Sequence, residues 1–119
     1  MKNKNNKVNG KARESGLGHK LKSTRDGFGE ALLELGKKNK DIVAVSADLA
    51  ESTRLHHFAQ KYPSRFVEVG VAEQNMMGIA AGLALEGKIP FAASFGVFSP
   101  GRNWDQLRVS VCYSNANVK

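Results

Sequence analysis

Glu73 is the residue of this sequence best placed to do proton chemistry. It follows a β-branched run and opens a stretch with helical periodicity, so we expect it at a corner between a strand and a helix. Its apolar neighbours Ala72, Met76 and Met77 would partly desolvate the carboxylate, and a desolvated carboxyl group is useful for proton exchange. A structural role stays open, because the helix dipole favours any carboxylate in a first turn.

Two aromatic side chains form a second candidate feature. Phe95 and Phe98 lie three residues apart after a predicted strand, with Gly96 and Gly101 beside them. Two aromatic rings at a strand end could sandwich a flat heterocycle. The alternative is that both rings belong to the hydrophobic core.

Polar residues also follow the first predicted strand. Asp48 ends that strand and Ser52 lies four residues on, so both are candidates for ligand contact, and a turn with a helix cap is the alternative. His56 and His57 are adjacent, which is poor metal geometry, and no Cys or His partner stands at a ligand spacing. We therefore predict no metal site.

Hydrophobic periodicity predicts the elements that must position these residues. An alternating order of helices and strands favours an α/β fold, a parallel sheet with helices on both faces, and ligands in such sheets sit at the carboxyl ends of strands. The last helix is expected to carry Trp104, Leu107 and Val111 on one face. We expect helices at 24–38, 53–61, 72–86 and 101–113, strands at 42–45, 65–69 and 89–95, and the entry to a fourth strand at 117–119.

Charge divides the chain of 119 residues into a basic arm at 1–23 and a domain at 24–119. The net charge is +7, and residues 1–22 carry seven Lys and Arg against one acid. The near-neutral remainder argues against a nucleic-acid-binding domain, although the arm itself could contact RNA or an acidic partner. The single Cys112 is expected to be a buried structural thiol.

The polar start of the chain has no signal-peptide core, and no window is apolar enough for a membrane span. We therefore expect a cytoplasmic protein without membrane contact.

Three segments together resemble the pyrimidine-binding domain of transketolase, most closely the C-terminal subunit of split transketolases. They are SADL with the following ST at 46–53, GVAEQNM at 70–76, and FGVFSPGR at 95–102. The resemblance covers about residues 24–119 and implies the parallel fold of a thiamine-diphosphate-binding pyrimidine domain.

The resemblance also implies a role for each candidate residue. Glu73 would be catalytic, forming a hydrogen bond with ring nitrogen N1′ of the cofactor's aminopyrimidine and so promoting loss of the thiazolium C2 proton, while the cofactor carries the hard step. Phe95 and Phe98 would form the wall on which the pyrimidine stacks, and Asp48 would lie near the thiazolium.

The substrate would be a sugar phosphate, and the reaction the transfer of a two-carbon ketol group in pentose phosphate metabolism. Arg25 and Ser52 match positions that hold the substrate phosphate, and a guanidinium can grip phosphate through two hydrogen bonds. Many single-chain transketolases carry Tyr where Gly101 stands, so one aromatic contact of the family is missing.

The diphosphate and its Mg²⁺ are held in this family by a different domain, whose GDG-type motif is absent from this sequence. The expected partner is therefore a diphosphate-binding N-terminal subunit, in a dimer or heterotetramer. Because the sheet stops at its fourth strand, we expect the sequence to be a fragment of a longer subunit, inactive alone.

Two other functions stay open. Deoxyxylulose-phosphate synthase and the beta subunit of 2-oxo-acid dehydrogenases share the glutamate and the stacking wall. A non-catalytic α/β interaction module, binding through its basic arm, is the third interpretation.

Overall fold

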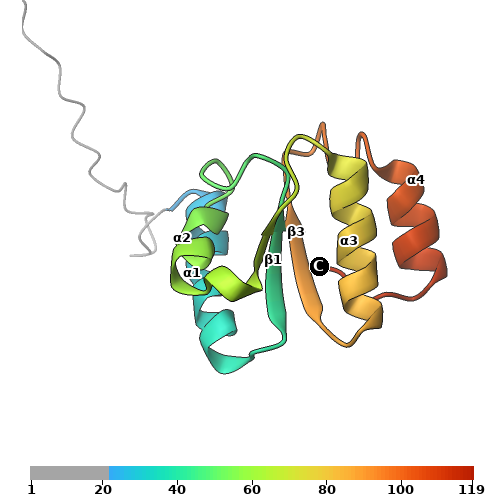
Figure 1. Cartoon of the computed structure of the whole chain (residues 1–119). Helices are drawn as coiled ribbons and strands as arrows, with labels where there is room; N and C mark the ends of the chain where they lie inside the picture. The colour runs from blue at the N-terminus through green and yellow to red at the C-terminus, as the bar shows by residue number, and fades with distance from the viewer. Residues whose placement is uncertain (1–21) are drawn as a thin grey trace, which may run out of the picture.

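A computed structural model describes residues 22–119. Figure 1 shows three layers, with the sheet between α1 and α2 on one side and α3 on the other. In chain order the elements are α1 (Thr24–Lys38), β1 (Ile42–Ser46), α2 (Leu55–Lys61), the 3-10 turn η1 (Pro63–Arg65), β2 (Phe66–Glu68), α3 (Glu73–Leu85), β3 (Ile89–Ala93), α4 (Trp104–Gln106) and the π-helix η2 (Leu107–Tyr113).

The three strands form a parallel sheet in the order β2-β1-β3, which confirms the predicted α/β class. Ala44 in the central strand lies opposite Phe66 of β2 and Phe91 of β3. All three strands therefore end at one edge of the sheet, and the segments that follow them meet there.

The alternation of side chains along β1 builds a core on both faces of the sheet. All five residues of β1 are buried, as expected of a central parallel strand. One face packs against α1 and α2, through Leu32, Ile42, Ala44, Leu55 and Phe58. The other face packs against α3, through Val43, Val45, Met76 and Ala80.

Both ends of α1 are fixed by side chains. The Ser23 hydroxyl accepts a hydrogen bond from the backbone N–H of Asp26, which caps the first turn. At the other end, the Arg65 guanidinium donates to the backbone carbonyls of Gly36 at 2.8 Å and Asn39 at 3.0 Å. The helix that carries Arg25 is thereby tied to the start of β2.

The end of the chain differs from the predicted helix at 101–113. The regular helix begins only at Trp104, and it widens into a π-helix from Leu107. Val111 is buried against α3 and Leu107 packs beside it, but Trp104 is 63% exposed and Cys112 is exposed. The prediction of a buried thiol was wrong, and Trp104 does not share the buried face of Val111, because the wider π turn rotates side chains out of a 3.6-residue periodicity.

The last residues lie beside β3, where the sequence predicted another strand. The backbone N–H of Lys119 donates to Pro90, and its carbonyl accepts from Ala92, both at 2.9 Å. This is the pairing of a parallel ladder, although it is too short to count as a strand. Val118 packs against both apolar clusters around α3.

The predicted basic arm lies almost wholly outside the described residues, which begin at Lys22. Among residues 22–119, no helix is long and apolar enough to cross a membrane.

Candidate active site

The segments 47–54, 69–72 and 94–103 follow β1, β2 and β3 and gather at one edge of the sheet, uppermost in Figure 1. Five of the six predicted site residues lie on these segments or, for Glu73, on the helical turn that follows one of them. The sixth, Arg25, lies in the first turn of α1. Parallel strands thus collect residues that are far apart in the sequence.

Asp48, Glu73 and Phe98 line one hollow of about 230 Å³, which we call the glutamate hollow. Arg102 also lines it, together with the smaller residues Ala47, Leu49 and Val71. The structure thus brings together three of the four residues predicted to contact a cofactor, and it adds a guanidinium.

Glu73 is the first residue of α3, and its side chain is only 5% exposed. The Nη1 atom of Arg102 lies 3.5 Å from each carboxylate oxygen of Glu73. A carboxylate this deeply buried needs a partner, because the desolvation of an unpaired charge costs several kcal/mol. Arg102 supplies that partner from the segment after β3.

Asn103 fixes the start of α3 from the same segment. It is completely buried, and its Nδ2 donates to the backbone carbonyl of Glu73 at 3.2 Å and to the Ser99 hydroxyl at 3.0 Å. Sequence reasoning missed Asn103 and Arg102. The only available signal was their position at a strand end, since their contacts join residues 29 and 30 apart.

Asp48 is held by the side chain of Glu68, which sequence reasoning also missed. One oxygen of Glu68 accepts hydrogen bonds from the backbone N–H of Asp48 at 2.7 Å and from that of Gly70 at 2.9 Å. Asp48 has a φ of 59°, in the left-handed region that Asp tolerates better than most residues. Glu68 therefore joins the segment after β1 to the segment after β2.

Phe95 and Phe98 stack on each other. Their ring centroids lie 6.1 Å apart and their planes differ by 23°. A ring held between them would need about 7 Å, because carbon atoms in contact lie about 3.5 Å apart. The pair can therefore serve as a wall against which a ring lies, and the option of a two-sided clamp is excluded in this arrangement.

Arg25, Ser52 and Phe95 line a second hollow of about 420 Å³, which we call the arginine hollow. The remaining lining residues are Thr24, Phe28, Thr53, Ala92, Ala93, Ser94 and Ser99. Both residues predicted to bind a phosphate thus face one cavity. Phe95 lines the arginine hollow and Phe98 the glutamate hollow, so the stacked pair connects the two.

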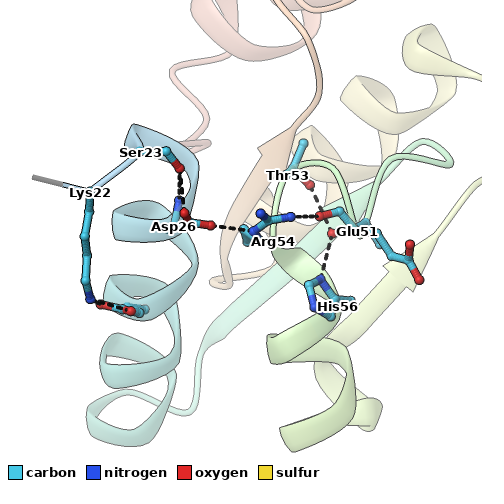
Figure 2. A network of polar contacts seen from close by, with 9 residues as sticks. Lys22, Ser23, Asp26, Glu51, Thr53, Arg54 and His56 are labelled. Atoms are coloured by element: carbon cyan, nitrogen blue, oxygen red, sulfur yellow. Dashed lines mark hydrogen bonds and ion pairs between the residues drawn. The ribbon is translucent and has the colours of Figure 1, made fainter. Parts of the chain in front are cut away.

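A polar network holds α1 against the segment that carries Ser52 (Figure 2). The Arg54 guanidinium donates to the Asp26 carboxylate at 2.5 Å and to the backbone carbonyl of Glu51 at 3.0 Å. The hydrogen bond from Arg54, and after it the one from Ser23, holds the pKa of Asp26 below its ordinary value. Arg25 precedes Asp26 in the sequence and Ser52 follows Glu51, so this network helps to fix the distance between Arg25 and Ser52.

Within residues 22–119, no three His, Cys, Asp or Glu side chains gather in a way that could hold a metal ion. His56 and His57 lie with ring centroids 3.8 Å apart, and His56 Nδ1 faces the backbone carbonyl of Ala50. Ser52 does not cap the following helix, because α2 has no side-chain cap.

Comparison with known proteins identifies the family. Residues 20–119 match the family model described as transketolase, pyrimidine binding domain. The chain belongs to the transketolase pyrimidine-binding domain family. This confirms the resemblance seen in the three sequence segments.

Individual relatives of this pyrimidine-binding domain agree with the family match. A putative transketolase C-terminal section from Methanocaldococcus jannaschii is 53% identical over 98 residues, which is 82% of this chain and 31% of that protein. A 1-deoxy-D-xylulose-5-phosphate synthase from Desulfotalea psychrophila is 47% identical over 91 residues, 76% of this chain and 14% of that protein.

Among solved structures, the chain is similar to a split-gene transketolase described as an inactive beta4 tetramer. The TM-score is 0.72 at 52% identity, over 80% of this chain and 32% of that one. This pyrimidine-binding domain therefore spans about a third or less of the length of the proteins that it matches.

Proposed function

We propose that this chain supplies the pyrimidine half of a thiamine diphosphate site in a transketolase, which transfers a two-carbon ketol group between sugar phosphates. The observation that carries the proposal is the glutamate hollow. It places a buried carboxylate, Glu73, beside the aromatic face of Phe98.

The residues of this hollow fit an aminopyrimidine. Such a ring offers a flat aromatic face and a ring nitrogen, and it needs a surface to stack on and a polar group at its edge. The stacked pair of Phe95 and Phe98 provides the surface, and Glu73 provides a hydrogen-bonding group with its side chain 95% removed from water. When bound, the cofactor supplies the carbanion chemistry of ketol transfer.

Each residue then has a defined task. Glu73 forms a hydrogen bond with ring nitrogen N1′ and so holds or accepts a proton there, in surroundings that exclude competing water. Phe98, backed by Phe95, fixes the plane of the ring. Asp48, whose backbone N–H is held by Glu68, lines the same hollow, and its carboxylate would lie near the cationic part of the cofactor.

The arginine hollow is the proposed site for the phosphate of the sugar. Arg25 brings a permanent positive charge with several N–H donors, and Ser52 brings a hydroxyl that can donate to a phosphate oxygen. The hollow adjoins the glutamate hollow across the two phenylalanines, so a sugar phosphate bound there would extend toward the cofactor.

A partner subunit must complete this site. We propose that the cofactor's diphosphate and its Mg²⁺ are held by a diphosphate-binding N-terminal subunit, in a dimer or heterotetramer. The split-gene organisation named for the related structure supports this arrangement.

A second candidate function for this chain is that of a 1-deoxy-D-xylulose-5-phosphate synthase, which uses the same cofactor. The relative from Desulfotalea psychrophila supports this candidate. That function would use the same Glu73 and the same aromatic wall, but a different donor. An assay of the assembled complex separates the two. Turnover of xylulose 5-phosphate indicates a transketolase, and turnover of pyruvate indicates the synthase.

The proposal is tested by Glu73→Ala in a complex of this subunit with a diphosphate-binding partner. We expect ketol transfer to fall by at least about 100-fold, the usual size of a lost proton-transfer group. Glu86→Ala removes an exposed glutamate just beyond the other end of α3 and should leave the rate unchanged. Assembly, followed by gel filtration, should be the same for both variants. Near-normal turnover of Glu73→Ala in an intact complex would show that Glu73 has no catalytic role.

A further inference from the structure

Arg102 contacts two groups at once in the glutamate hollow. Its Nη1 atom lies 3.5 Å from both carboxylate oxygens of Glu73, and its guanidinium carbon lies 4.4 Å from the ring centroid of Phe98. The side chain therefore forms an ion pair and a cation–π contact from one position.

These two groups are the ones that the proposed function assigns to the pyrimidine ring. A guanidinium resembles such a ring in two respects. It is flat enough to stack on an aromatic face, and its edge carries N–H donors for a carboxylate, as the edge of the ring does once its nitrogen is protonated. The two cannot occupy the same contacts together. We propose that Arg102 competes with the aminopyrimidine for Glu73 and Phe98, and that it thereby sets the affinity of this site for the cofactor. The inference rests on the proposed function.

The exposure of the two partners makes the exchange feasible. The Arg102 side chain is 53% exposed, whereas that of Glu73 is 5% exposed. Among residues 22–119, the guanidinium has no hydrogen-bond partner other than Glu73. Arg102 can therefore move into water at little cost, while Glu73 has to exchange one partner for another.

That exchange keeps the buried carboxylate satisfied. Removing the partner of a buried charge is costly unless a new hydrogen bond replaces it. The ring nitrogen replaces that bond when one proton, taken up from solvent, lies between it and the Glu73 carboxylate, and the ring takes over the stacking contact with Phe98. The competition is therefore between two alternative partners for the same pair of residues.

Thiamine, which lacks the diphosphate, tests this half of the site by itself. We would titrate it into the 119-residue chain and follow backbone amide shifts by NMR for the wild type, R102A and R102K. R102A should bind thiamine about fivefold more tightly, the size expected for one exposed cation–π and ion-pair contact. R102K keeps the charge without the planar fork and should fall between the two, and it also serves if R102A does not fold.

Two controls separate displacement from simple charge repulsion of the cationic thiamine. Arg108 is exposed and lines a different surface with Cys112 and Tyr113, so R108A should bind thiamine like the wild type. Raising the ionic strength from about 0.15 M to about 1 M shortens the screening length from about 8 Å to about 3 Å, and the advantage of R102A should persist.

The outcomes distinguish this inference from the proposed function. If the wild type binds thiamine and R102A binds equally or more weakly, the competition is refuted and the pyrimidine site stands. If the advantage of R102A vanishes in high salt, Arg102 acts only as a charge and the competition is again refuted. If neither protein binds thiamine, the pyrimidine site itself is contradicted, and the inference fails with it.

Discussion

Glu73 acquires its chemical character from residues on three separate segments of the chain. Sequence reasoning could place Glu73 with Asp48 and Phe98, because the ends of parallel strands meet at one edge of a sheet. It could not find Arg102 or Asn103. Their roles depend on contacts between the segment after β3 and the start of α3, and no local sequence pattern predicts those contacts.

Gly101 shows how tightly that segment is folded. A Cβ atom at this position would lie 2.0 Å from the backbone carbonyl oxygen of Val97. A larger residue, such as the Tyr of many single-chain transketolases, is therefore excluded without a shift of the backbone. The aromatic contact noted as missing in the sequence thus falls at a position where the backbone of Val97 leaves no room for a side chain.

We expect Gly101→Ala to lower the free energy of unfolding by about 1–3 kcal/mol, the range for overpacking at a close contact. The strain should also displace the segment that carries Phe95 and Phe98. Gly96→Ala is the matched control, because nothing lies within 4 Å of a Cβ built there. Urea denaturation measures both, and equal stability of the two variants would contradict the close approach at Gly101.

At the scale of elements, α1 and the segment after β1 both line the arginine hollow, and a polar contact holds them together. This contact joins Asp26, in the first turn of α1, to Arg54, which directly precedes α2 (Figure 2). Arg54 itself has a φ of 68°, so this segment turns sharply to bring the guanidinium toward α1.

Because of this contact, the free energy of unfolding should depend on pH in the acidic range. The hydrogen bond from Arg54 lowers the pKa of Asp26 in the folded chain, so its contribution is fully present above the unfolded pKa of about 4. This contribution to stability is lost as the pH falls from about 4 through the lowered pKa that Asp26 has in the folded chain. Asp26→Asn should therefore reduce stability at neutral pH, and its difference from the wild type should shrink below about pH 4.

Thermal melts across that pH range check the dependence. Glu30→Gln is the control, since Glu30 is an exposed residue of the same helix paired with exposed Lys22. A difference between Asp26→Asn and the wild type that stays constant from neutral pH to acid would show that the contact does not contribute as described.

The elements themselves were predictable to different degrees. The amphipathic stripe of α1 and the short β-branched run of β1 each specify one structure, and both were found close to their observed bounds. The π-helix at Leu107–Tyr113 was not predictable, because its wider turn breaks the 3.6-residue pattern on which such predictions depend. For that reason Cys112 was misplaced, and Trp104 does not share the buried face of Val111.

At the scale of the whole molecule, the order β2-β1-β3 produces two adjoining hollows. The segments after β2 and β3 flank the segment after β1. Glu73, at the start of α3, and Phe98 line the glutamate hollow, whereas Arg25, on α1, and Ser52 line the arginine hollow. The stacked phenylalanines stand between them. This arrangement is the physical basis for assigning a cofactor ring to one hollow and a substrate phosphate to the other.

The central claim is that the pyrimidine ring of the cofactor binds at Glu73 and Phe98. Its most direct test is an NMR titration of the 119-residue chain with thiamine, in the wild type and in Glu73→Gln. We predict amide shifts confined to residues 47–49, 71–75 and 95–103 in the wild type. We expect Glu73→Gln to weaken the apparent affinity at least about tenfold, as for a lost hydrogen bond to a charged group. Shifts located elsewhere, or an affinity unchanged in Glu73→Gln, would contradict the account.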